Sequence, residues 1–244
     1  MPPGSLTKLL VAAQVRGTHS TGIAWFNRGC DRYSFYKNAV PAEKFVVDDN
    51  LNVALAETAS FGIAHCRNAS PKMPVNTDNA HPFVWHKLIY AHNGAVKNWH
   101  TLRASLFNTE EGEKVTTDSM VLGPLLEYND LSLARGSFGL VWLDKSKCWM
   151  ARSAKELTAI HLTWTINGQH GKVTLAGSTL DILLKGFDHV PEATWFEYEV
   201  KEGHKYELTE EALLVHGPIK INEANATDAH SSGSVVWKKL NSQI

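Results

Sequence analysis

Short apolar segments separated by turn residues recur along the chain, and this pattern restricts the fold more than any other feature. Such segments, ending at Asn, Gly, Asp or Lys-Ser clusters, are typical of antiparallel hairpins. Four hairpins are predicted, pairing residues 21–26 with 32–37, 137–144 with 148–152, 159–166 with 173–176, and 195–200 with 204–208. Two more short strands are predicted at 61–66 and 87–92.

Helical periodicity is limited to a few segments. Leucines and an alanine fall on one stripe after Ser5, which we expect to cap a helix that ends at Gly17. Two further helices are predicted over 96–107 and 119–127, the second following Thr117-Asp118. Hairpins with a few covering helices predict one α+β domain.

Composition narrows the class of partner. The 244 residues are 43% hydrophobic, and 24 Lys+Arg against 25 Asp+Glu leave a net charge of −1, so nucleic acid is not an expected partner. Three cysteines without a CxxC pair suit a reducing compartment. No apolar run approaches the ~18 residues of a membrane span, and no signal-peptide pattern opens the chain. We therefore expect a cytoplasmic protein without a membrane partner, folded over 1–221 with a flexible tail at 222–244.

Five polar segments carry a family resemblance through their chain order. They are Arg16-Gly-Thr-His-Ser-Thr-Gly-Ile-Ala24, Gly62-Ile-Ala-His-Cys-Arg-Asn-Ala-Ser70, Asn79-Ala-His-Pro82, His92-Asn-Gly94 and Thr116-Thr-Asp-Ser119. In this order they resemble the glutaminase domain of class II glutamine amidotransferases, which are N-terminal nucleophile hydrolases. The match runs from about Leu6 to about Phe187, and stand-alone domains, including phage-encoded ones, are the nearest likeness. The resemblance implies a four-layer αββα sandwich of two antiparallel sheets between helices.

The resemblance also implies roles for five residues. Arg67 matches the guanidinium that holds the α-carboxylate of glutamine, and Asp118 the acid that receives its α-ammonium. Ser70 matches a threonine of the substrate pocket, while Asn93 and Gly94 match the oxyanion donors. Each has a structural alternative: Arg67 as a surface charge or ion-pair partner, Asp118 as a helix cap, and Asn93-Gly94 as a type I′ turn.

Three positions depart from the family pattern. Asn68 stands where an aromatic residue is usual, Pro71 where His is usual, and His19 where Asp is commoner. The first two leave the pocket shape and the substrate open. The change at His19 suggests that a structural contact has been rewired.

The family nucleophile is a cysteine that follows the initiator Met in a Met-Cys-Gly-Ile strand, and the sequence as printed shows neither. Cys30, Cys66 and Cys148 are expected in the core, with Cys66 on the opposite strand face from Arg67. Pro2, as a terminal amine, is a weaker substitute. We therefore expect either an upstream start or a protein that has lost catalysis and its first strand.

Two functions follow from the resemblance. With a cysteine supplied from an upstream start, the domain would hydrolyse the side-chain amide of glutamine through a thioester, giving glutamate and ammonia. The ammonia would then need a separate acceptor enzyme or protein partner. The alternative is a catalytically inactive protein of this fold that acts as a binding or regulatory partner. No metal or organic cofactor is expected, because the twelve histidines show no HExxH or comparable spacing.

Overall fold

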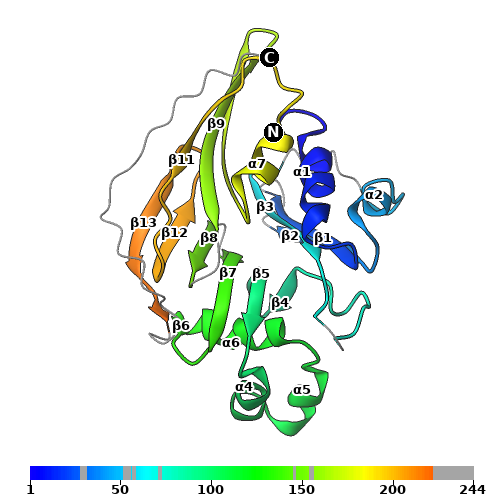
Figure 1. The fold of residues 1–244 in the computed structure, drawn as a ribbon, viewed down its shortest axis with the longest axis vertical. Helices are drawn as coiled ribbons and strands as arrows, with labels where there is room; N and C mark the ends of the chain where they lie inside the picture. Colours follow the sequence, from blue (N-terminus) through cyan, green and yellow to red (C-terminus); the bar gives the residue numbers. More distant parts are fainter. Residues whose placement is uncertain are drawn as a thin grey trace.

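The computed structural model describes residues 1–27, 32–51, 56, 59–70, 73–144, 147–153 and 157–221. The predicted tail at 222–244, Cys30, Pro71 and the predicted Lys145-Ser146 turn lie outside these ranges. Figure 1 shows the arrangement of the helices and strands.

One six-stranded antiparallel sheet forms the centre of the molecule. Its strand order is β13-β12-β8-β7-β5-β4. The strands are β4 (Phe83–Trp85), β5 (Leu88–Val96), β7 (Gly136–Asp144), β8 (Lys147–Arg152), β12 (His204–Leu208) and β13 (Leu213–Pro218).

Two three-stranded antiparallel sheets pack on this central sheet. The first has the order β2-β1-β3 and contains β1 (Ser20–Asn27), β2 (Arg32–Asn38) and β3 (Phe61–Arg67). The second has the order β10-β9-β11 and contains β9 (Thr158–Ile166), β10 (Gln169–Gly177) and β11 (Thr194–Tyr198). A short parallel pair joins β6 (Asp130–Leu131) to β14 (Lys220–Ile221).

Helices cover both outer faces of these sheets (Figure 1). The three-stranded sheets are covered by α1 (Ser5–Ala13), the 3₁₀ turn η1 (Gln14–Arg16), α2 (Ala42–Phe45) and α7 (Leu180–Lys185). Beside the six-stranded sheet lie α4 (Trp99–Leu106), α5 (Thr109–Lys114), the 3₁₀ turn η2 (Asp118–Val121) and α6 (Leu122–Glu127). The layers therefore follow the order helix, sheet, sheet, helix, which confirms the predicted αββα architecture.

Side-chain alternation explains how one strand serves two layers. Ile23 and Trp25 of β1 pack in the cluster beneath α1 and α2, whereas Ala24 packs with Ile89 of β5 between the two sheets. Successive strand residues point to opposite faces, so a strand covered on both sides needs apolar residues at consecutive positions. Burying a side chain such as Ile23, which is 2% exposed, contributes roughly 1.5–3 kcal/mol.

One predicted hairpin is wrong. β11 pairs with β9, and β12 pairs with β8 and β13, so residues 195–200 and 204–208 belong to different sheets. The turn itself is present, with Gly203 at φ 66°, but the chain passes there from one sheet to the other. Tyr198 and Val200 pack in the cluster that joins these sheets, and this burial outweighs local pairing.

Helix starts also differ from the sequence prediction. Gly4, not Ser5, is the N-cap of α1, and Ser5 is a buried helical residue. The helix predicted from Val96 begins at Trp99, because Val96 is still paired in β5. No helix in the described ranges is long and apolar enough to cross a membrane.

Candidate functional site

Arg67 is the last residue of β3, where the strand enters a loop. Its side chain is only 6% exposed, so the surface-charge interpretation is wrong. One N–H at Nη1 donates to the Pro74 carbonyl at 3.0 Å, which orients a group with five donors. Cys66 contacts the Leu10 carbonyl beneath α1, in the cluster on the other side of the strand, as alternation predicted.

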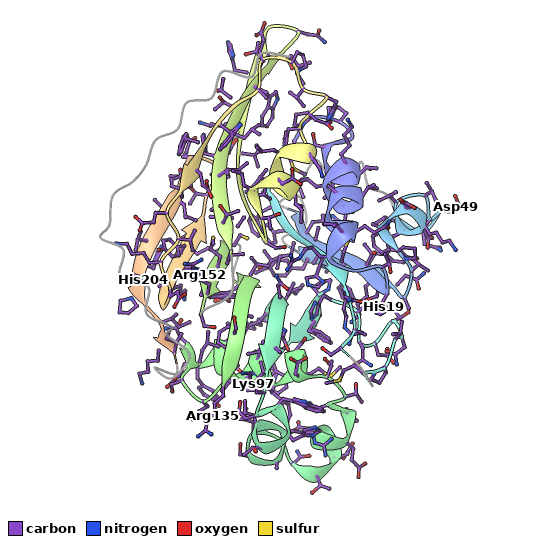
Figure 2. The ribbon with its side chains drawn as sticks, viewed as in Figure 1. His19, Asp49, Lys97, Arg135, Arg152 and His204 are labelled. Carbon is purple, nitrogen blue, oxygen red and sulfur yellow. The ribbon has the colours of Figure 1, made fainter. Side chains whose placement is uncertain are left out.

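The chain around Arg67 is held by the segment that precedes β1. A Cβ on Gly17 would lie 2.2 Å from the Arg67 carbonyl carbon, so only glycine allows this approach. His19, labelled in Figure 2, donates its backbone N–H to the Arg67 carbonyl, and its Nδ1 accepts the Ala69 N–H at 2.9 Å. A carboxylate could accept the same bond, which explains how His replaces the commoner Asp.

Asn93 and Gly94 lie inside β5 rather than in a turn. They pair with Gly139 and Phe138 of β7, so the type I′ interpretation is wrong. Gly94 has a φ of 132°, and a Cβ there would lie 2.0 Å from the Ser137 carbonyl oxygen. Within the described part of the chain, the buried Nδ2 of Asn93 has no hydrogen-bond partner. The site therefore holds an unused amide donor beside a glycine that no other residue can replace without strain.

Asp118 connects η2 to the end of β5. Its Oδ2 accepts the Val96 N–H at 2.9 Å, and its Oδ1 accepts the Thr117 hydroxyl at 3.2 Å. Thr117 is the N-cap residue of η2 and makes no side-chain cap bond, so Asp118 is not the predicted helix cap. An ionised carboxylate has about four acceptor sites, so both oxygens retain capacity for a cation.

Electrostatic interactions place Asp118 near two other groups of the site. Burial lowers the pKa of Arg67, while the nearby Asp118 carboxylate acts in the opposite direction. The same carboxylate opposes the lowering of the His92 pKa by burial. The Asp118 carboxylate thus acts on both Arg67 and His92, the residue that precedes Asn93 on β5. Figure 2 labels Lys97, which follows the end of β5, and Arg135, which precedes the start of β7; the Lys97 N–H donates to the Arg135 carbonyl.

Ser70 differs from this buried group in its exposure. Ser70 is exposed in the loop after β3, and its backbone carbonyl accepts the Met73 N–H. A pocket role for its hydroxyl stays a prediction.

Sequence reasoning missed a cluster of three histidines and a serine. His65, His81, His92 and Ser119 contact one another at 2.9–3.2 Å through side-chain atoms and the His92 carbonyl. All four stand inside the quoted polar segments, so their positions were visible. Their mutual contact was not, because it depends on tertiary packing of β3, β5, η2 and the loop before β4.

The two described cysteines do not provide a reactive thiol. Burial raises the pKa of Cys66 to about 11 and that of Cys148 to about 12, so both remain protonated at neutral pH. Both pack in hydrophobic clusters, as predicted. In the described ranges, no three His, Cys, Asp or Glu residues are arranged to hold a metal ion.

The layered antiparallel sheets between helices define the fold of the N-terminal nucleophile amidotransferases. Glutamine phosphoribosylpyrophosphate amidotransferase from B. subtilis superimposes with a TM-score of 0.63 at 20% identity, over 88% of this chain and 46% of that one. The structure described as the allosteric regulatory enzyme of purine biosynthesis gives 0.57 at 15% identity over the same shares. At these identities the likeness concerns the fold.

Sequence comparison points to the same class. Glutamine–fructose-6-phosphate aminotransferase (isomerizing) from Caulobacter vibrioides is 30% identical over 148 residues, covering 60% of this chain and 22% of the relative. The Pyrococcus horikoshii enzyme of that name is 29% identical over 162 residues, covering 59% and 26%. The chain spans about a quarter of the length of these curated relatives. No protein-family model matches it. The chain is thus similar in sequence to these glutamine-dependent aminotransferases and in fold to the amidotransferases.

Proposed function

We propose that the buried group at the ends of β3 and β5 binds the amino-acid end of glutamine or glutamate. Arg67 would receive the α-carboxylate through paired N–H donors, and Asp118 would receive the α-ammonium. The observation that supports this most is the electrostatic attraction between the buried Arg67 guanidinium and the Asp118 carboxylate, one complementary charge for each end of a zwitterion. Ser70 would line the pocket from its loop.

The side-chain amide would then lie against β5. The unpartnered Nδ2 of Asn93 and the backbone N–H of Gly94 would donate to the oxygen that becomes negative when the amide carbon is attacked. With a cysteine presented there, its thiolate would add to that carbon, ammonia would leave with a proton, and water would hydrolyse the thioester to glutamate. The released ammonia would pass to a separate acceptor enzyme or protein partner.

A second candidate function is regulatory: the chain would bind the amino acid without hydrolysing it and would act as a binding or regulatory partner of another protein. The chemistry of the described cysteines favours this alternative, because Cys66 and Cys148 are buried with raised pKa values. Neither is suited to attack a bound amide.

Calorimetric titration with glutamine and with glutamate tests the proposal. We expect binding to the unmodified chain and at least about a tenfold loss in Arg67→Gln, because a charge-assisted fork contributes more than about 1.4 kcal/mol. Arg103→Gln on α4, where Arg103 lies against the Trp99 ring, is the matched control and should leave affinity unchanged. Binding that is indifferent to Arg67 would refute the pocket.

Ammonia release from glutamine separates the enzyme from the binding alternative. We expect no release from the chain as printed, and release from a variant that begins with an added Met-Cys-Gly-Ile segment if the site is catalytically intact. Binding without release in both would favour the regulatory alternative.

A further inference from the structure

The histidine cluster forms a closed circuit of contacts. His92 Nδ1 lies 3.0 Å from Ser119 Oγ, and Ser119 Oγ lies 2.9 Å from His81 Nε2. His81 Nδ1 lies 3.0 Å from both ring nitrogens of His65, and His65 Nε2 lies 3.2 Å from the carbonyl oxygen of His92. The path therefore leaves His92 through its side chain and returns through its backbone.

One consistent direction of hydrogen bonds runs around the circuit from its one carbonyl. A carbonyl only accepts, so His65 Nε2 carries the proton, and in a neutral ring His65 Nδ1 is then an acceptor. His81 Nδ1–H donates to it, which leaves His81 Nε2 to accept the hydroxyl proton of Ser119. Ser119 Oγ in turn accepts from His92 Nδ1–H. This direction assigns one tautomer to each imidazole, and it takes the contact from His81 Nδ1 to His65 Nδ1, rather than the equally long one to His65 Nε2, as the hydrogen bond.

In this direction all three imidazoles are neutral. A second proton on His65 or His81 would point an N–H at another donor. Burial favours neutrality, since His81 is 3% and His92 is 4% exposed. Burial is also the main cause that lowers the pKa of each histidine, to about 3 for His65.

The charged neighbours act on these histidines in both directions. Arg67 lowers the pKa of His65 and of His81, and Lys37 also lowers that of His81. Among the groups identified around His92, only Asp118 favours its charged form. Lys37 reaches the loop before β4 from β2, where its Nζ donates to the Ala80 carbonyl at 2.9 Å.

Three of the four members of the circuit are close in sequence to a group of the proposed pocket. His65 lies two residues before Arg67 on β3, so both side chains leave the same face of that strand. His92 directly precedes Asn93, and Ser119 directly follows Asp118. His81 joins them from the loop before β4, where a Cβ on Gly22 would lie only 2.0 Å from its carbonyl oxygen.

We propose that His65, His81, His92 and Ser119 form a closed ring of neutral hydrogen bonds that positions Arg67, Asn93 and Asp118 relative to one another. The ring clamps β3, β5 and η2 from the inside. Because successive residues leave opposite faces of β5, fixing His92 on one face sets the direction of the Asn93 amide on the other. The four residues are positioning residues, and the effect on ligand binding rests on the proposed function.

The ring leaves little capacity for other chemistry. Both nitrogens of His65 and His81 are engaged, and the lone pair on His92 Nε2 is buried without a partner among the described residues. Ser119 is 3% exposed and its hydroxyl is shared between two imidazoles, so the nearby His81 does not make it an accessible nucleophile.

Nuclear magnetic resonance of the histidine side chains tests the ring on the ligand-free protein. Two-bond ¹H–¹⁵N spectra of ¹⁵N-labelled protein report which ring nitrogen carries the proton. We expect His65 as the Nε2–H tautomer and both His81 and His92 as the Nδ1–H tautomer, unchanged from neutral to mildly acidic pH. A cationic imidazole, or an Nε2–H tautomer at His81 or His92, would overturn the proposal.

Ser119→Ala tests the positioning role. We expect it to release His81 and His92 from their single tautomers and to weaken glutamate binding by about tenfold or more. Ser119→Thr, which keeps the hydroxyl, should restore both. Thr174→Val is the matched control, since it removes a hydroxyl 3.2 Å from the buried His161 in the other three-stranded sheet.

Three outcomes separate the two proposals. If unmodified protein has the expected tautomers but binds neither glutamine nor glutamate, the proposed function fails and the ring stands. If glutamate binds through Arg67 with full affinity in Ser119→Ala, the positioning role fails and the proposed function stands. Covalent labelling of Ser119 by a serine-reactive fluorophosphonate would also overturn the inference, because it would make Ser119 a nucleophile.

Discussion

The carboxylate of Asp118 accepts the backbone N–H of Val96 at 2.9 Å. This bond ties the start of η2 to the end of β5, three residues after Asn93. A residue that looks like a helix cap in the sequence instead joins two segments of the proposed site. Ligand binding and local architecture therefore depend on the same carboxylate, and variants must be chosen to separate the two.

Replacing Gly94 should be much more damaging than replacing another glycine with a positive φ. Gly94→Ala combines a φ of 132° with a Cβ 2.0 Å from the Ser137 carbonyl oxygen. Gly168→Ala has a φ of 76° but open space around the new Cβ. We expect about 1 kcal/mol of destabilisation at Gly168 and more than about 3 kcal/mol at Gly94, measured by urea unfolding. Equal losses would contradict the close packing of β5 on β7.

The unfolding free energy should fall as the pH falls below the pKa of a free histidine side chain. The pKa values of His65, His81 and His92 are lowered from 6.5 by burial, so the unfolded chain binds more protons in that range. Their contribution to the unfolding free energy is complete above pH 6.5. It is lost as the pH falls toward their pKa values in the folded protein, about 3 for His65. The slope should reach about 1.4 kcal/mol per pH unit for each histidine. Urea unfolding between about pH 5 and 8 measures it, and a flat profile would contradict buried neutral imidazoles.

The described cysteines should resist alkylation in the native protein. Cys66 and Cys148 are buried, and their pKa values are raised to about 11 and about 12. Iodoacetamide at mildly alkaline pH, followed by mass spectrometry, should label both in urea and neither in the folded state. A Cys30→Ser variant removes the third thiol from the measurement. Fast native labelling of Cys66 would show that the cluster beneath α1 opens.

His19 can be tested through the hydrogen bond that its side chain accepts. Its Nδ1 accepts the Ala69 N–H beside Arg67. His19→Ala should cost about 1 kcal/mol of unfolding free energy, whereas His19→Asp should keep an acceptor and most of the stability. Thermal unfolding of the two variants measures the difference. Equal stability of both would mean that the contact contributes nothing.

Local pairing was predictable where strands follow one another across a turn. β1 with β2 and β7 with β8 were predicted from alternation and turn residues alone. β11 and β12 were not separated correctly, because the choice of partner sheet depends on packing far along the chain. Asn93-Gly94 carries the same local signal as a turn. Its place inside β5 depends on a close approach to Ser137 that neighbouring residues do not encode.

The site was predictable only in part, for a similar reason. Arg67, Asn93 and Asp118 were singled out by resemblance, and each then needed a tertiary contact to reveal its environment. The ring of His65, His81, His92 and Ser119 escaped prediction because it joins residues from positions 65 to 119 through hydrogen bonds whose direction depends on tautomers. Single histidines in a sequence do not indicate a shared circuit.

The most direct test is a crystal structure of the chain with glutamate. We expect the α-carboxylate on the Arg67 guanidinium, the α-ammonium on Asp118, and a side-chain carboxylate oxygen near Asn93 Nδ2 and the Gly94 N–H. Glutamate bound elsewhere, or bound with its α-carboxylate away from Arg67, would contradict the account.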